Sequence, residues 1–583
     1  MKIAYAQMNV AAGRPDENTH RILHLIERAR AGGAKMVIFP ELAVSGQFLG
    51  DTFLQESFLH ECERCGEEII AASKNLTVMF GNIKLKRDLS NLHVFNGAFV
   101  ATNGKLKNFC AKEHPSADEQ RYFTQPFETP SVIEVEIGGD DFEVVPLFDG
   151  DGIELTNFDF AIKFSCAPFS LTKNISDEKI DAEEPLICVG AVGLQNTGKT
   201  VYTFDGGSGV FNSRGEIVQL AEPFVESLNF VELDVIDKMP AIKVPVVDET
   251  EKIYRSLSYG VKNFLQEIGI GKVVIGVSGG IDSAVAAALY TKILGAENIL
   301  LVNMPSVFNS ATTRSLSEQL AKNLGCKYCV VPIQESVDWT VKQLEATPIT
   351  FLSDGTSEKI TLSSFVRENI QARDRSARIL AALAASIGGG FTCNANKAET
   401  TVGYATLYGD EAGFLSALAD LWKFQVYALA RYMNEKIYGR EVIPQGIIDI
   451  VPSAELSTAQ NVDEGKGDPL KYPYHDYLFR AFVEENLRPE DFLRLYERGE
   501  VERRIGCAAG LVKKYFPTAA DFVADLERWW KQFTCMGVAK RIQSPPILAV
   551  TNHPYGARRE SQNGWHVTKT YKALKDNLLS SGV

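Results

Sequence analysis

The feature that most limits how this chain can fold is residues 273–284, which read "VVIGVSGGIDSA". An apolar strand leads into the glycine-rich turn at residues 278–280, and Asp282 and Ser283 open an alanine-rich helix. Glycines let the backbone approach a ligand closely, and the start of a helix adds partial positive charge. The stretch lacks the GxxxxGK[ST] pattern of a Walker loop. Taken alone, SGG fits an ordinary tight turn, whereas the complete SGGxDS run predicts a pyrophosphate cradle.

Strands and helices alternate along residues 251–583. "KIYRSLSYGVKNFLQEIG" has the period of a helix, "NILLVNMP" reads as a buried strand, and "SATTRSLSEQLAKNLG" reads as the next helix. Such alternation predicts an α/β fold with a doubly wound parallel sheet and helices on both faces. Ligands bind these sheets beyond the carboxyl ends of the strands, which is where the glycine turn falls.

Residues 1–240 show a different, strand-rich α/β pattern. "KIAYAQMNV" reads as a strand, "NTHRILHLIERARAGG" as an amphipathic helix ended by glycine, and "AKMVIFPEL" as a strand ending in a carboxylate. The following stretch "VIDKMPAIKVPVVDET" contains two prolines and little helical periodicity. We therefore expect two domains, residues 1–240 and 251–583, joined by a linker at residues 241–250.

Composition excludes several classes of function. The net charge of −14 argues against a nucleic-acid-binding protein, which needs a dominant basic face. No apolar run is long enough to span a membrane, and the N-terminus does not read as a signal peptide. Ten cysteines in 583 residues are too sparse for a disulfide scaffold. The pairs Cys62/Cys65 and Cys326/Cys329 have CxxC spacing, but free thiols in a reducing cytoplasm are expected rather than a zinc site.

Further motifs follow the glycine turn in a fixed order. They are "VRENIQARDRSARILAAL", "CNANKAETTVGYATLYGDEAG", "DLWKFQVYALARYMN", "VPSAELSTAQ" and "AKRIQSPP". The turn itself resembles the PP-loop of ATP pyrophosphatases, and the whole series resembles the NAD+ synthetase family over essentially all of residues 251–583. Two departures are visible: Asn394 stands where the family commonly has threonine, and Ala398 replaces the serine of its NKSE motif.

This resemblance implies ATP-dependent amidation of deamido-NAD+, in which adenylylation activates the carboxylate and releases pyrophosphate. Mg²⁺ would neutralise the phosphates, and hard oxygen ligands suit it. The ATP-binding residues implied are Gly276, Val277, Ser278, Gly279, Gly280, Ile281, Asp282, Ser283, Asn394, Lys423 and Ser453. The deamido-NAD+ contacts implied are Asn369, Arg373, Glu399, Tyr404 and Lys540. The resemblance also implies metal ligation by Asp282 and Glu399 and catalytic roles for Asp410 and Lys423.

The first half carries "VIFPELAVSG", "NFCAKEHPSADEQRYF" and "VGLQNTGKTVYTFDGGSGVFNSRGEI". These stretches resemble the nitrilase, or carbon–nitrogen hydrolase, family, and in particular the glutaminase domain fused to NAD+ synthetases. The resemblance implies an α-β-β-α sandwich and a Glu–Lys–Cys triad, with the glutamate as base, the lysine at the oxyanion and the cysteine as nucleophile. Glu41 and Lys112 match the first two members.

The triad cysteine has two competing placements. In one, "FAIKFSCAPF" supplies Cys166 as the nucleophile. In the other, "FEVVPLFDGDG" is the cysteine strand, Phe148 holds the cysteine's position, and Cys166 is a small buried hydrophobe followed by Ala167 where the family has a substrate-binding serine. The second placement keeps the order and approximate lengths of the elements, and we prefer it. It predicts a phenyl ring in the pocket and a first domain retained as a scaffold.

Three hypotheses about function follow. The chain amidates deamido-NAD+ with free ammonia, or it hydrolyses glutamine through Cys166 to obtain the ammonia, or it is a non-catalytic binding protein built from two enzyme folds. The intact residues around the glycine turn argue against the third hypothesis. The expected partners are small molecules (deamido-NAD+, ATP, and ammonia or glutamine), and the family resemblance suggests a homo-oligomer with a synthetase dimer at its centre.

Overall fold

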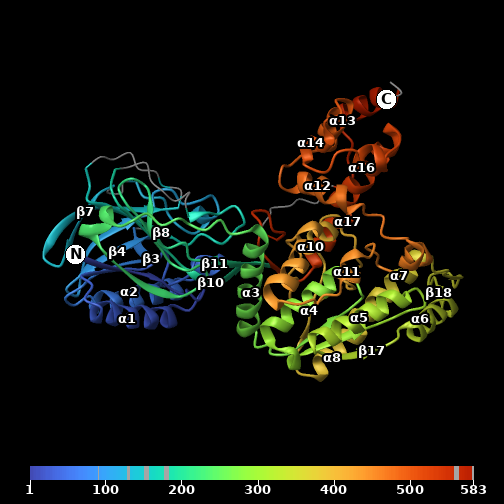
Figure 1. Ribbon diagram of the computed structural model, residues 1–583, viewed down its shortest axis with the longest axis horizontal. Helices are drawn as coiled ribbons and strands as arrows, with labels where there is room; N and C mark the ends of the chain where they lie inside the picture. Colours follow the sequence, from blue (N-terminus) through green and yellow to red (C-terminus); the bar gives the residue numbers. More distant parts are fainter. Residues whose placement is uncertain are drawn as a thin grey trace. The chain divides into compact units, whose positions relative to one another are not determined.

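The computed structural model describes residues 1–88, 91–127, 131–149, 151, 157–175, 183–556 and 564–580. The chain divides into two compact units, of which the first comprises residues 1–197 and 201–248 and the second residues 198–200 and 249–583 (Figure 1). The stretch expected to be a linker is irregular as far as residue 248, and helix α3 (Glu249–Glu267) follows. Within the described ranges no helix is long and apolar enough to cross a membrane.

The first unit is built on two six-stranded sheets. One runs in the order β14 (Ser227–Glu232), β1 (Lys2–Gln7), β2 (Met36–Ile38), β3 (Thr77–Arg87), β4 (Leu92–Thr102) and β5 (Lys105–Ala111). The other runs in the order β13 (Ile217–Leu220), β12 (Gly209–Phe211), β9 (Leu186–Gly190), β8 (Phe160–Ser165), β7 (Asp140–Phe148) and β6 (Ile133–Ile137). The hairpin strands β10 (Val192–Thr197) and β11 (Thr200–Asp205) pair with each other.

The core of the first unit lies between these sheets. Alternate residues such as Tyr5 of β1 and Ile162 of β8 pack against one another there. The intervening residues of the first sheet pack against α1 (Pro15–Ala31) and α2 (Glu56–Ala71). In the described part of this unit no α-helix covers the outer face of the second sheet, so the layers described are α-β-β.

The second unit contains the expected parallel sheet, in the order β17 (Lys327–Val330), β16 (Ile299–Asn303), β15 (Val273–Gly276) and β20 (Gly390–Phe391). Helices α4 (Ile281–Leu294), α5 (Ala311–Leu324) and α6 (Gln334–Ala346) follow its strands in turn. Val274 of β15 packs with Val337 of α6, whereas its buried neighbours Val273 and Ile275 point to the opposite face. The doubly wound α/β class is thereby confirmed.

The remaining helices extend this unit toward the C-terminus (Figure 1). They are α7 (Ser364–Arg373), α8 (Ala381–Ser386), α9 (Lys397–Val402), α10 (Lys423–Tyr432), α11 (Gln445–Asp449), α12 (Tyr472–Val483), α13 (Pro489–Glu497), α14 (Val501–Ile505), α15 (Leu511–Tyr515), α16 (Ala519–Thr534), α17 (Met536–Gln543) and α18 (Lys569–Ser580). A π-helical turn, Asp374–Leu380, joins α7 to α8. The C-terminal helices share one apolar core with α9, to which Phe479 and Trp529 contribute fully buried rings.

Candidate active site

The glycine turn leads from the end of β15 directly into α4. Gly279 has a φ of +86°, in the left-handed region that glycine adopts without strain. A Cβ atom at this position would lie 2.4 Å from the backbone oxygen of Thr313 in α5. Glycine is therefore required where the turn passes over α5.

Two serine hydroxyls hold the turn in shape. Ser283 Oγ accepts a hydrogen bond from the Ser278 backbone N–H at 3.3 Å and donates to the Gly280 oxygen at 3.1 Å. Ser278 Oγ accepts from the Gly280 N–H at 3.2 Å. The turn is thus organised by its own residues at the N-terminus of α4, an arrangement that suits a phosphate group.

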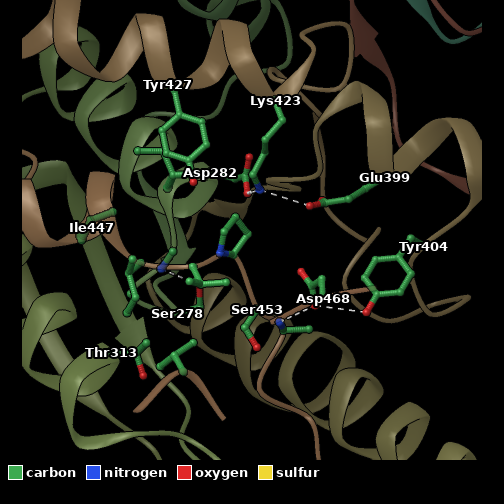
Figure 2. A pocket seen from close by; sticks show the side chains of 18 of the residues that line it. Ser278, Asp282, Thr313, Glu399, Tyr404, Lys423, Tyr427, Ile447, Ser453 and Asp468 are labelled. Atoms are coloured by element: carbon green, nitrogen blue, oxygen red, sulfur yellow. Dashed lines mark hydrogen bonds and ion pairs between the residues drawn. The ribbon is translucent and has the colours of Figure 1, made fainter. Parts of the chain in front are cut away.

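Lys423, the first residue of α10, lies between two carboxylates (Figure 2). Its Nζ is 2.5 Å from Asp282 Oδ2 and 3.4 Å from Glu399 Oε1. Burial acts to lower the pKa of Lys423, but these carboxylates raise it above its ordinary value, so the lysine is charged at neutral pH. Burial raises the pKa of Glu399 to about 7, against the lowering effect of Lys423. One cation between two carboxylate groups leaves an acidic centre that suits a further cation.

Asn396 ties this centre to α9. Its Oδ1 caps the helix by accepting from the N–H groups of Ala398 at 3.0 Å and Glu399 at 3.2 Å, and its Nδ2 donates to Asp282 Oδ1 at 3.1 Å. The neighbouring Lys397 is fully buried and pairs with Asp420 at 2.8 Å. Asn396 and Lys397 lie in one sequence motif and Asp420 opens the next, but nothing in the sequence indicated that Lys397 and Asp420 pair.

Two adjoining cavities open around the centre, of about 260 and 130 Å³. Both are lined by Ser278, Asp282, Glu399, Asp410 and Ala454. The larger cavity is also lined by Gly276, Val277, Ser283 and Asn394. The smaller cavity is also lined by Gly279, Gly280, Ile281, Tyr404, Lys423, Ser453 and Asp468 (Figure 2). All the residues assigned to ATP by resemblance therefore line one or both of these adjoining cavities, together with Asp468, which the sequence did not single out.

Polar contacts fix several of these lining side chains. Asn394 Nδ2 donates to the Gly276 oxygen at 3.3 Å, which joins β20's loop to the end of β15. Tyr404 donates its hydroxyl to Asp468 Oδ1 at 3.1 Å. Asp410 Oδ1 accepts from the Thr406 N–H at 2.8 Å.

Three residues assigned to deamido-NAD+ stand outside the linings of these two cavities. Asn369 donates to the Phe365 oxygen at 2.7 Å within α7, and Arg373 Nε donates to the Leu407 oxygen at 3.0 Å. Lys540 of α17 donates to the Gly403 oxygen at 2.7 Å. Their roles remain predictions.

In the first unit, Glu41 and Lys112 form a buried network. Lys112 Nζ is 3.0 Å from Glu41 Oε1 and 3.0 Å from Glu119 Oε1, and Asn96 donates to Glu41 Oε1 at 2.6 Å. The Glu41 side chain is 0% exposed and the Lys112 side chain 4% exposed. Burial raises the pKa of Glu41 to about 7, against the lowering effect of Lys112. Glu119 ends the "HPSADE" stretch, and the sequence did not single it out.

The structure corrects the place given to Phe148. Its ring lies in the core between the two sheets, with its centroid 5.7 Å from that of Phe164, and so does not fill a pocket at Glu41. The next residue, Asp149, is the one whose charge acts on Glu41 and raises its pKa. Asp149 Oδ2 accepts from Ser165 Oγ at 3.1 Å. The assignment of the cysteine's position to Phe148 stays a prediction, but the ring is part of the inter-sheet core and does not block a pocket.

Cys166 follows β8, which runs parallel to β7 with Phe148 opposite Phe164. The thiol is 1% exposed and belongs to the apolar core beneath α1 and α2. Burial raises its pKa well above the ordinary value, and the charges of Glu41 and Asp149 raise it further. Cys166 is therefore near the buried network but is held as a thiol, which is a poor nucleophile.

Comparison with known proteins covers both units. The NAD synthase family matches residues 253–506, and the carbon–nitrogen hydrolase family matches residues 2–158. The glutamine-dependent NAD(+) synthetase of Aquifex aeolicus is 30% identical over 541 residues, covering 85% of this chain and 91% of that protein. The enzyme of the same name from Synechocystis is 29% identical, with 97% and 98% covered.

Solved structures agree on the fold. The glutamine-dependent NAD+ synthetase of Acinetobacter baumannii, in complex with ADP, superimposes with a TM-score of 0.66 at 23% identity, covering 97% of this chain and 99% of that one. The enzyme from Cytophaga hutchinsonii gives a TM-score of 0.76 at 17% identity, with 99% of each chain covered. The two-part architecture therefore extends over the whole chain.

Proposed function

The chain belongs to the family of two-part NAD+ synthetases, and from that premise we propose how this ligase activates deamido-NAD+ and where its nitrogen comes from. The reaction runs through a deamido-NAD adenylate, with AMP and pyrophosphate as products and ammonia as the direct nitrogen donor. The observation that carries the proposal is the Lys423 centre beside the glycine turn, since it joins a phosphate cradle to a cation and two carboxylates.

The ATP phosphates would lie against the glycine turn and the N-terminus of α4, with Lys423 countering their charge. Asp282 and Glu399 offer the hard oxygen ligands that Mg²⁺ prefers, and the excess of negative charge at the centre fits a divalent cation. A bound Mg²⁺ would supply charge neutralisation for the phosphates. Asn369, Arg373, Tyr404 and Lys540 would hold deamido-NAD+.

The chemistry then needs two displacements. An oxygen of the substrate carboxylate attacks the α-phosphorus of ATP, and pyrophosphate leaves with the electron pair of the broken P–O bond. The nitrogen of ammonia attacks the acyl carbon, AMP leaves, and the nitrogen loses one proton to become the amide. Lys423 offsets the charge that develops on the phosphates in the first step, and we assign Asp410, which lines both cavities, to the second step.

The first unit would serve as a scaffold. Glu41 and Lys112 persist, but the charged residue that follows β7 and acts on Glu41 is Asp149, whose carboxylate would not form the thioester of a cysteine nucleophile. A second candidate is glutamine hydrolysis through Cys166, which two findings favour: the thiol lies near Glu41 and Lys112, and the named relatives are glutamine-dependent.

The test is NAD+ formation at matched glutamine and ammonium concentrations, with glutamate release followed in parallel. We expect ammonium to support the reaction and glutamine to fail, with Cys166→Ala leaving the ammonium-dependent rate unchanged. Cys188→Ala, at another buried cysteine of the same unit, is the matched control. Stoichiometric glutamate release that Cys166→Ala abolishes would establish the glutamine-dependent alternative.

We also propose a homo-oligomer built on a synthetase dimer, which light scattering would test.

A further inference from the structure

Helix α12 brings an aromatic side chain to the Lys423 centre from the C-terminal part of the second unit. The Tyr472 hydroxyl donates a hydrogen bond to Glu399 Oε1 at 2.9 Å. The Nζ of Lys423 lies 4.7 Å from the centroid of the same ring, within the range of a cation–π contact. Tyr472 is 6% exposed. One buried side chain therefore contacts both the lysine and one of its two carboxylates.

A second residue of α12 fixes the backbone that carries Lys423. Asp476, one helical turn after Tyr472, accepts a hydrogen bond at Oδ2 from the N–H of Phe424, at 2.9 Å. That N–H lies in the first turn of α10, where the helix has no partner of its own for it. Residues four apart share one face of a helix, so a single face of α12 holds both the side chains and the backbone of the centre.

Polar contacts of the neighbouring His475 fix the rotation of α12. His475 is fully buried; its Nδ1 accepts from the Lys471 N–H at 2.7 Å, and its Nε2 lies 2.9 Å from Asp525 Oδ2 of α16. Trp529 Nε1 donates to Asp525 Oδ1 at 3.1 Å. The C-terminal helices thus orient α12, and α12 orients the centre.

We propose that Tyr472 is a positioning residue for this synthetase, acting through Glu399 and Lys423. Among the described residues, both hydrogen bonds to the Glu399 carboxylate, from Lys423 and from Tyr472, go to Oε1. The hydroxyl therefore sets the rotation of the carboxylate and leaves Oε2 for a ligand in the cavity. This inference rests on the role proposed above for Glu399 and Lys423, because Tyr472 itself touches neither reacting group.

The first test compares Tyr472→Phe with Tyr477→Phe. Both changes remove one hydroxyl from α12, but the Tyr477 ring stacks on Phe424, with the ring centroids 5.4 Å apart, whereas the Tyr472 hydroxyl donates to Glu399. We expect Tyr472→Phe to lower kcat/KM for ATP about tenfold, as the loss of a hydrogen bond to a charged group does, and Tyr477→Phe to stay within about twofold of the parent. Wild-type kinetics in Tyr472→Phe would overturn the proposal.

The second test places both changes in a Glu399→Gln background, using more protein to measure the residual rate. If Tyr472 acts through Glu399, the further effect of Tyr472→Phe falls below about twofold there, since the two residues form one unit. An undiminished tenfold loss would show that the hydroxyl acts through general stability, and would refute positioning. Unchanged activity in Glu399→Gln and Lys423→Ala alone would instead refute the proposed function, so the two failures are distinguishable.

Discussion

Lys112 is the cation of the buried network in the first unit, and replacing it with methionine tests whether that network is structural. The change keeps most of the side-chain volume but leaves Glu41 and Glu119 without the ammonium group 3.0 Å from each. Removing one partner of a buried ion pair typically costs about 3–5 kcal/mol. For a unit of this size each kcal/mol shifts Tm by about 2–4 °C, so we expect a fall of about 6–20 °C.

The destabilisation caused by Lys112→Met should depend on pH. The pKa of Glu41 is raised to about 7 in the folded protein, so its protonated form stabilises the native state at low pH, and this contribution is lost as pH rises through about 7. The charge of Lys112 lowers the pKa of Glu41, so Lys112→Met raises that pKa further. In the variant, the native state therefore continues to lose stability as the pH rises above 7. The difference between variant and parent is therefore smallest at pH 5, where Glu41 is protonated in both, and largest above pH 7.

The assay is calorimetry of the full chain, following the transition of the first unit, with ammonium-dependent NAD+ formation measured below both melting temperatures. Lys107→Met on β5 is the matched control, because Lys107 and Glu136 are exposed and 3.8 Å apart. Such pairs contribute about 0–1 kcal/mol. If Lys112→Met melts like Lys107→Met, or stops NAD+ formation without lowering Tm, the network is not a structural one.

Two further predictions concern the second unit. Asp282→Ala should remove a carboxylate from the Lys423 centre and lower the rate by about 10²-fold or more, as lost electrostatic stabilisation does; ADP and phosphate as products, instead of AMP and pyrophosphate, would overturn the assignment. Gly279→Ala should raise KM for ATP and lower Tm, since its Cβ would lie 2.4 Å from the Thr313 oxygen at a φ of +86°; parent-like values for both would show that the turn can move away from α5.

The sequence located the Lys423 centre because its parts carry local signals. Asp282 opens a helix after a glycine turn, whereas Glu399 was implied by the resemblance of its motif to the NAD+ synthetase family. Tyr472 gave no such signal. It lies in an aromatic run, "KYPYHDYLF", that reads as a buried helix face, and its contact with Glu399 spans 73 residues. Only the packing of the C-terminal helices against α9 brings the two together.

The first unit shows why the direction of a single side chain in a strand is harder to predict from the sequence than the strand itself. The stretches that form β7 and β8 were both interpreted as strands, and they are parallel neighbours with Phe148 opposite Phe164. A shift of one residue along β7 nevertheless moves a side chain from one face of the sheet to the other, so it exchanges a core phenyl ring for Asp149. The two side chains would have different effects on the site. A phenyl ring would block a pocket, whereas Asp149 adds a charge that favours the protonated form of Glu41. The proposed loss of glutaminase chemistry therefore rests on the carboxylate of Asp149 and the buried thiol of Cys166.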